Sequence, residues 1–193
     1  MKEVISVNHA DNETLAMRLA NGDLSSVKMT GHSIDRIYKN GVLVDEIVGH
    51  NLVVDSFLKL VMCLLKQESG YAGIKYWAVG SGASSWDTTT VNPDKNSNTL
   101  TAELGRVAID PKNIVFLTSN FEVSATPTNI IQVSHTFGED DCNGAWREFG
   151  LFGGDASANR DSGIMINKRH HPVLTKTSDM SVERIMRFTI SLA

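Results

Sequence analysis

The sequence is poor in the residues that small proteins use to cross-link or interrupt their folds. Of its 193 residues, 2 are cysteines and 4 are prolines, and the cysteines stand far apart, at positions 63 and 142. A chain of this length buries about 70% of its unfolded surface, so it needs neither a disulfide nor a metal to fold. Hydrophobic residues make up 41% and charged residues 21%, an ordinary globular composition that argues against disorder.

Long runs of like charge and long apolar runs are also missing. The formal net charge is −4, whereas a protein that neutralises phosphates normally carries a basic excess, so we expect no nucleic acid partner. The most apolar segment, FLKLVMCLL, is about half as long as a membrane span requires. The start of the chain lacks the apolar stretch of a signal peptide. We therefore expect a soluble protein made in the cytoplasm, with no membrane partner.

The distribution of apolar residues predicts a mainly β (α+β) fold. Asn-Gly pairs join partly alternating runs within 14–29 and 33–47, and each predicts an N-terminal hairpin, the second with a bulge. Further runs typical of strands lie at 74–80, 113–119, 129–137, 145–153, 162–170 and 182–192. About eight strands with one firm helix favour a β-sandwich or a barrel-like fold.

The firm helix is expected at about residues 55–67, with Asp55 or Ser56 as its N-cap. Its apolar residues cover more than one stripe, which predicts a central helix that is buried on most sides. A second, short helix is expected within 97–106. Between them, residues 83–98 are rich in Ser, Thr, Asn and Asp, and such long loops often carry function.

No motif predicts catalysis or a cofactor. The glycine pairs match neither the GxxxxGK[ST] nor the GxGxxG phosphate-binding pattern, and there is no GxSxG elbow or paired-carboxylate signature. The adjacent His170 and His171 would point to opposite faces of a strand, which is wrong for two ligands of one metal. A metal site built from distant residues, such as His135, His171 and Asp179, remains open. We assign no catalytic residue, metal ligand or cofactor and expect no enzymatic activity.

The segment AWREFGLFGG predicts a strand that ends in a glycine turn. On a regular strand Trp146 and Glu148 share one face, and Arg147 and Phe149 share the other. A charge on each face predicts that Arg147 or Glu148 meets a buried ion-pair partner or an interface, and a structural role is favoured over catalysis. Asp155, in the exposed loop after the glycines, is a candidate contact for a ligand or partner.

Several stretches together resemble a family of tail-associated structural proteins of bacteriophages and prophages. They are HNLVVDSFLKLV, IKYWAVGSGASSWD, ELGR, TPTN, DCNGAWREFGLFGGDAS and INKRHHPVLTKTSDMSVERIMRFT. In that family a VGTG turn precedes a polar loop, followed by EL.R, E.GLFGG and KT..M. The resemblance covers about residues 34–191 and leaves residues 1–30 as an N-terminal arm or hairpin, a possible docking segment ahead of a β-rich body at 31–193.

The resemblance implies a structural protein of a virion, in a tail fibre, baseplate or related appendage. Its implied partners are copies of itself, with a trimer favoured, and other virion or tail proteins. The alternative is a receptor- or carbohydrate-binding module at an appendage tip, with a host surface glycan as partner. Trp86, in the long polar loop, is the candidate for stacking on a sugar ring, whereas Trp77 lies in a strand-like run and is expected in the core.

Overall fold

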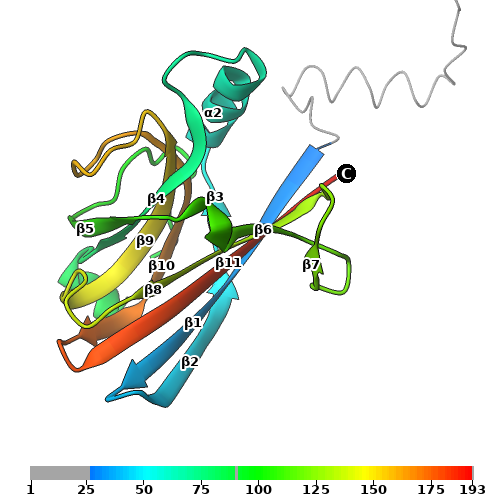
Figure 1. Ribbon diagram of the computed structural model, residues 1–193. Helices are drawn as coiled ribbons and strands as arrows, with labels where there is room; N and C mark the ends of the chain where they lie inside the picture. The colour runs from blue at the N-terminus through cyan, green and yellow to red at the C-terminus, as the bar shows by residue number, and fades with distance from the viewer. Residues whose placement is uncertain (1–26, 90, 193) are drawn as a thin grey trace, which may run out of the picture.

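In the part that the structure describes, the protein is a two-layer β-sandwich with one short helix (Figure 1). Its computed structural model describes residues 27–89 and 91–192. One antiparallel sheet has six strands in the order β2-β1-β11-β8-β6-β7, and the other has five in the order β3-β10-β9-β4-β5. The prediction of a mainly β sandwich with a helix and an N-terminal hairpin is confirmed.

The two sheets are built from strands that alternate along the described part of the chain. The six-stranded sheet consists of β1 (Val27–Lys39), β2 (Val42–His50), β6 (Ile114–Leu117), β7 (Val123–Ser124), β8 (Ile130–Phe137) and β11 (Met180–Leu192). The five-stranded sheet consists of β3 (Leu52–Val53), β4 (Ala72–Gly80), β5 (Glu103–Ala108), β9 (Gly144–Gly154) and β10 (Ile164–Lys176). The helix is α2 (Ser56–Leu65), and two 3-10 turns are η1 (Ser84–Asp87) and η2 (Pro111–Asn113).

The hairpin of β1 and β2 turns at the Asn-Gly pair that predicted it. Asn40 and Gly41 have φ angles of 48° and 78°, and a two-residue hairpin turn of this type needs positive φ at both positions. The register of the two strands shifts between Ile37 and Tyr38, where the expected bulge interrupts the alternation. Both predictions for this hairpin are confirmed.

The N-terminal boundary lies earlier than the resemblance suggested. Strand β1 begins at Val27 and pairs with β11 along its whole length, so residues 27–30 belong to the sheet. The other expectations for the N-terminal arm, including most of the hairpin over 14–29, lie outside the described residues.

The core lies between the two sheets, and a second cluster covers the outer face of the five-stranded sheet. Trp77 is fully buried in the main core, as expected. The second cluster consists of Val54, Ala78, Leu100, Phe152, Ala156 and Met165. Because β9 contributes Leu151 to the main core and Phe152 to the second cluster, it is buried on both faces. This double burial explains why the GLFGG run carries no charge.

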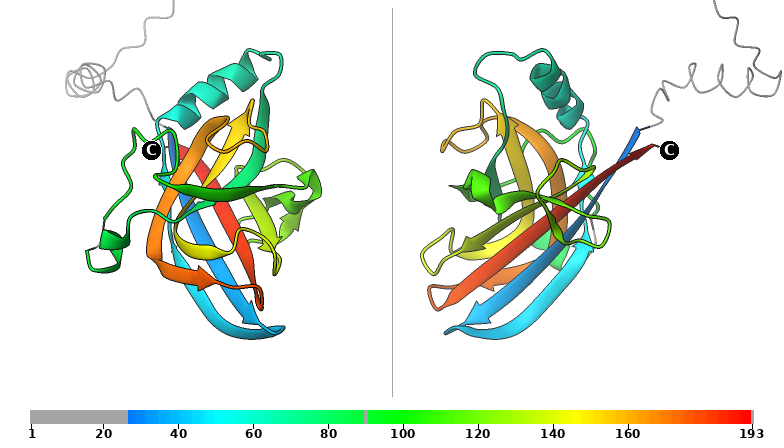
Figure 2. Two further views of the ribbon diagram at one scale, coloured as in Figure 1. Left: turned by 90° about the vertical axis from the view of Figure 1, so that its left-hand side faces the viewer. Right: turned by 45° about the vertical axis from the view of Figure 1, so that its right-hand side comes forward.

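The prediction of a central helix buried on most sides is wrong. Helix α2 lies at one end of the sandwich (Figures 1 and 2), and Leu60 is its one buried residue. Leu58, Met62 and Leu65 are 66%, 63% and 72% exposed. The two sheets pack directly against each other, so the helix does not lie between them. Its apolar side chains therefore do not all pack against other residues of the described chain.

The short helix expected within 97–106 is also absent. Its second half is the start of strand β5, which pairs with β4 from Glu103 opposite Gly80 onward. Pairing with the free edge of β4 satisfies the backbone groups of both strands, and this tertiary contact outweighs the helix propensity of the segment.

Candidate functional site

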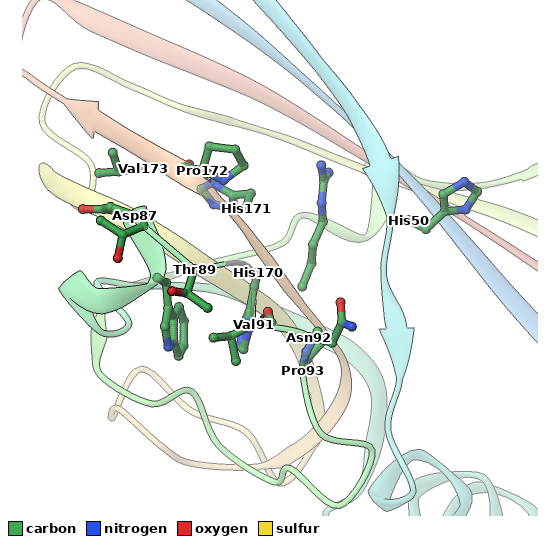
Figure 3. Close-up of a pocket in the computed structure, with 13 residues that line it drawn as sticks. His50, Asp87, Thr89, Val91, Asn92, Pro93, His170, His171, Pro172 and Val173 are labelled. Carbon is green, nitrogen blue, oxygen red and sulfur yellow. Dashed lines mark hydrogen bonds between the residues drawn. The ribbon is translucent and has the colours of Figure 1, made fainter.

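A pocket of about 470 Å³ opens beside the outer edge of β10 (Figure 3). It is lined by residues 169–173 of β10, by residues 86–89 and 91–93 of the long polar loop, and by His50 at the end of β2. Strand β3 pairs with β10 at Asn167 and Lys168, ahead of this stretch. The polar loop lies beside residues 169–173, and the Nδ1 atom of His170 is 2.8 Å from the carbonyl oxygen of Val91 in this loop.

A bulge in β10 shapes the inner wall of the pocket. The register between β9 and β10 shifts between His170 and Leu174. His170 stacks on Trp86 at the outer side, with ring centroids 4.0 Å apart, whereas the ring of His171 lies 5.9 Å from that of Phe149 in the core. The two histidines therefore take opposite sides, as predicted. The strand continues past Pro172 to Lys176, beyond the end of the run at 162–170 that predicted it.

Trp86 lines the pocket, but its ring is already in contact with the protein on two sides. It stacks on His170 at an interplanar angle of 26°. It also packs on Gly82, where an added Cβ would lie 2.4 Å from the ring. Gly82 has a φ angle of +55°, so the turn itself favours glycine. Trp86 is therefore a fixed wall of the pocket.

Arg147 holds the loop that carries Trp86. Its Nε and Nη2 atoms donate to the two carboxylate oxygens of Asp87 at 2.8 and 2.7 Å, and its Nη1 atom donates to the carbonyl oxygen of Ser81 at 3.1 Å. The hydrogen bond to Asp87 raises the pKa of Arg147 and holds the pKa of Asp87 below its usual value. This paired geometry positions the η1 turn at the edge of the sheet.

Glu148 is fully buried and paired with other groups. Its Oε1 atom accepts a hydrogen bond from the backbone N–H of Ala102 at 2.9 Å, and its Oε2 atom lies 3.1 Å from Nζ of Lys168. Glu148 and Arg147 are therefore each in an ion pair, with different partners. The cation beside Glu148 neutralises its charge, which favours a structural role.

The predicted faces of this strand are not those observed. Trp146 and Phe149 both belong to the main core, although three positions separate them. Strict alternation cannot place both there, and the irregular pairing with β10 accounts for the change. As a result, Arg147 and Glu148 both contact the loop segment on the outer side of the sheet, instead of taking one face each.

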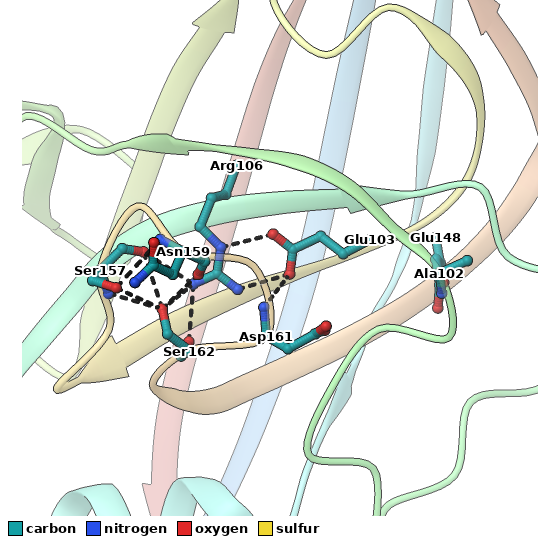
Figure 4. A network of polar contacts seen from close by, with 8 residues as sticks. All are labelled: Ala102, Glu103, Arg106, Glu148, Ser157, Asn159, Asp161 and Ser162. Carbon is teal, nitrogen blue, oxygen red and sulfur yellow. Dashed lines mark hydrogen bonds and ion pairs between the residues drawn. The ribbon is translucent and has the colours of Figure 1, made fainter.

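Asp155 does not line this pocket. It is exposed and follows Gly154, whose φ angle of +68° forms the predicted glycine turn. The loop beyond it is held by Arg106 (Figure 4), which is paired with Glu103 through two contacts of 2.7 Å. The same guanidinium donates to the carbonyl oxygen of Ser162 at 2.9 Å.

A buried polar cluster between the sheets was not found from the sequence. Asp35 on β1 and Arg184 on β11 form an ion pair whose side chains are 1% and 0% exposed. The guanidinium carbon of Arg184 lies 3.9 Å from the centre of the Phe149 ring. Arg169 of the pocket reaches from β10 to Ser33 on β1, to which it donates a hydrogen bond. These side chains link the pocket to the sandwich interior.

Burial determines the charge states around the pocket. It lowers the pKa of His171 to about 4 and also lowers the pKa of His170. Both imidazoles are therefore largely neutral near pH 7. Burial lowers the pKa of Arg169 as well, but arginine stays cationic in proteins. Arg169 thus brings a lasting positive charge to the pocket wall.

Within residues 27–89 and 91–192, no three His, Cys, Asp or Glu side chains gather closely enough to hold a metal ion. The combination of His135, His171 and Asp179 is therefore not assembled. Cys63 and Cys142 are free thiols, and burial raises the pKa of the Cys142 thiol. In the same part of the chain, no helix is long and apolar enough to span a membrane.

Comparison with models of known protein families finds no match, and a search of curated proteins finds no significant similarity.

Proposed function

We propose that this protein is a structural subunit of a phage tail or tail-like particle, which assembles with copies of itself and with other particle proteins. The proposal includes no catalytic activity. The observation that carries it is the exposed apolar hairpin of β1 and β2. The tail setting is supported by the resemblance of the ordered motifs within residues 34–191.

The hairpin exposes apolar side chains on both of its faces. Val42, Leu43 and Val44 are 64%, 51% and 56% exposed, although neighbouring residues of a strand point to opposite sides. The tip of the hairpin therefore projects beyond the region where the two sheets cover each other, as both views in Figure 2 show. Among the described strands, β2 is also an edge strand of its sheet, and an edge strand presents a row of backbone groups with which another chain can pair. An edge with these properties favours contact with a partner strand.

A second apolar surface lies at the opposite end of the molecule. It comprises the exposed side of α2 and a groove of about 490 Å³ between this helix and the six-stranded sheet. Phe57, Leu64, Phe116 and Ile190 are among the residues that line the groove. Two different apolar surfaces on one chain suit head-to-tail contacts, which give a closed ring when the rotation between subunits closes. A trimer, favoured by the resemblance, is the expected ring.

The test of self-assembly is the mass of the purified full chain by light scattering over a range of concentrations. We expect a trimer, and we expect Val44→Lys to shift the population toward monomer because a charge cannot be buried in the contact. The matched control is Val123→Lys, at a valine of β7 that is 71% exposed. A monomer at all concentrations for the unaltered chain would contradict self-assembly. Equal effects of the two substitutions would contradict the placing of the contact on the hairpin.

The particle setting needs a separate measurement. Particles released from the host bacterium should contain the chain in a fixed ratio to the other tail proteins when quantified by mass spectrometry. Detection in the soluble lysate alone, with none in purified particles, would refute the tail setting even if the chain forms a trimer.

A further inference from the structure

We propose that residues 15–24 of the chain bind in the apolar groove between α2 and the six-stranded sheet of their own subunit. The groove belongs to the second apolar surface of the proposed assembly, so a neighbouring subunit can use it only after this segment has left. That consequence for assembly rests on the proposed function, whereas the binding of the segment does not.

The groove has the composition of a site for apolar side chains. Its volume is about 490 Å³, and none of the residues that line it carries a charge. Leu64 on α2 and Ile190 on β11 line it and are 41% and 43% exposed. A contiguous apolar surface that is open to water usually marks a binding site. The occupant of this groove is therefore expected to be apolar and to need no charged partner.

The chain enters the described structure beside this groove. Strand β1 begins at Val27, and Met29, two positions later, lines the groove. Each residue spans at most about 3.6 Å, so Leu24 lies within about 11 Å of Val27 and Leu19 within about 29 Å. The hairpin tip is at the far end of β1, a strand of 13 residues that is about 40 Å long. These leucines therefore reach the groove but not the hairpin tip.

Residues 15–24 supply the apolar side chains that the groove lacks. Their sequence, LAMRLANGDL, contains three leucines and a methionine. It stands between two polar stretches, NHADNET before it and two serines after it. Removal of apolar surface from water favours the contact, and the stem of Arg18 can lie along an apolar wall while its charge stays in water.

The start of β1 also offers backbone groups to the segment. Residues 27–30 pair with β11 on one side, whereas pairing with β2 on the other side begins at His32. Among the described strands, none pairs with residues 27–30 on that second side. An open strand edge binds an extended segment through main-chain hydrogen bonds. Main-chain partners for the segment are therefore present next to the groove.

The covalent link decides which copy of the chain supplies the segment. Two serines separate Leu24 from Val27, and so short a link holds the segment near its own groove at an effective concentration in the millimolar range. A second copy offers the same residues only at the concentration of the protein. Mass action therefore favours the segment of the same subunit.

Hydrogen–deuterium exchange of the full chain tests the binding. We expect the amides of residues 15–24 to exchange at least about tenfold more slowly than those of a free peptide of residues 8–26. This protection should stay constant over the concentrations used for light scattering, because the contact lies within one subunit. Exchange at the rate of the free peptide would overturn the inference. Protection that rises with concentration would overturn the own-subunit placement in favour of a second copy.

Two neighbouring leucines of α2 test the location. Leu64 lines the groove, whereas Leu65, which is 72% exposed, does not. Leu64→Lys should restore fast exchange at residues 15–24, because an apolar segment cannot cover a charge without cost, and Leu65→Lys should leave the exchange slow. Unchanged exchange in β4 and β9 establishes that the variants are folded. Slow exchange in Leu64→Lys, or equal effects of the two substitutions, would overturn the groove as the site.

A substitution in the segment gives an independent test that leaves the groove intact. Leu19→Lys should free the groove and increase the fluorescence of an added anilinonaphthalene sulfonate dye, which binds exposed apolar surface. The matched control is Asn12→Lys, which adds the same charge outside residues 15–24 and should leave the fluorescence unchanged. Equal fluorescence in the two variants would overturn the inference, even if Leu64→Lys does not fold.

These outcomes are separate from those of the proposed function. A protected segment in a chain that light scattering finds monomeric would refute self-assembly and support this inference. A trimer whose residues 15–24 exchange at the rate of the free peptide would support self-assembly and overturn this inference.

Discussion

Arg184 and Asp35 face each other across the β1–β11 pair and form a two-pronged ion pair inside the sandwich. The Nε–Oδ1 and Nη2–Oδ2 distances are 2.6 and 2.8 Å. The guanidinium also lies over the ring of Phe149 and 5.4 Å from that of Trp146. This pair helps to fix the register of the first and last strands of the described chain, because a shift of one strand by one residue would turn its charge to the opposite face and separate the pair.

Asp35→Asn should destabilise the protein strongly. It leaves Arg184 and Arg169 buried without a carboxylate between them, and removal of one partner of a buried pair costs about 3–5 kcal/mol. Urea unfolding measures the loss. The control is Glu46→Gln, which breaks an exposed pair with Arg36 and should cost less than about 1 kcal/mol. Similar losses in the two variants would contradict this account of the cluster.

The stability of the fold should fall as the pH is lowered from 6.5 toward 4. Burial, together with the nearby charge of Arg184, lowers the pKa of His171 to about 4 in the folded state. Between these pH values the unfolded chain binds a proton that folded His171 does not, so its contribution is present above pH 6.5 and is lost as the pH falls. The shift corresponds to roughly 3 kcal/mol.

The free energy of unfolding from pH 4.5 to 7 tests this prediction. His171→Gln should flatten the profile, and His32→Gln, at an exposed histidine, should retain it. Some slope should remain in His171→Gln, because burial also lowers the pKa of His135 and His170. An unchanged slope in His171→Gln would show that His171 titrates normally.

Two glycines on the paired strands β4 and β9 should differ in how much a substitution by alanine destabilises the protein. A Cβ on Gly153 would lie 2.3 Å from the carbonyl oxygen of Gly73, a backbone atom that cannot move without disturbing the sheet. A Cβ on Gly73 would meet no atom within 4 Å. Gly153→Ala should therefore cost about 1–3 kcal/mol, whereas Gly73→Ala should change stability by less than about 0.5 kcal/mol. Thermal and urea unfolding of the two variants measure the contrast, which equal effects would disprove.

The strands were predictable because their signals are local. The Asn40-Gly41 pair identifies its hairpin from two residues, and the apolar GLFGG run predicts a buried strand without knowledge of its neighbours. The helix was placed correctly and its environment was not. The sequence pattern of an apolar helix surface is the same whether that surface packs inside its own chain or against a partner. The exposure of Leu58 and Met62 could therefore not be predicted.

The polar interior and the pocket were not predictable for a different reason. Asp35 and Arg184 are 149 residues apart, and each stands next to a charged residue on the opposite face, Arg36 or Glu183. The sequence does not indicate which charge of each neighbouring pair turns inward. The outcome depends on strand pairing between distant segments. Similarly, the bulge that moved Arg147 and Glu148 to the same side arises from contact with β10 and has no local signature.

Arg106 should control the order of the loop that follows β9. Its guanidinium joins Glu103 to the carbonyl oxygens of Ser157 and Ser162, 3.2 and 2.9 Å away, and Glu103 in turn accepts from the backbone N–H of Asp161 at 3.0 Å (Figure 4). The Arg106 and Glu103 side chains are each 1% exposed. Arg106→Gln removes most of these bonds while β5 keeps its backbone pairing with β4.

Hydrogen–deuterium exchange should then become faster at residues 157–162 and remain unchanged at 84–88. Arg147→Gln is the matched control, since it removes the other loop-holding guanidinium, which binds Asp87 and Ser81. In this variant the exchange rate should increase at residues 84–88 and remain unchanged at residues 157–162. Faster exchange in both loops in both variants would mean that the arginines stabilise the five-stranded sheet as a whole, and that neither one holds its own loop separately.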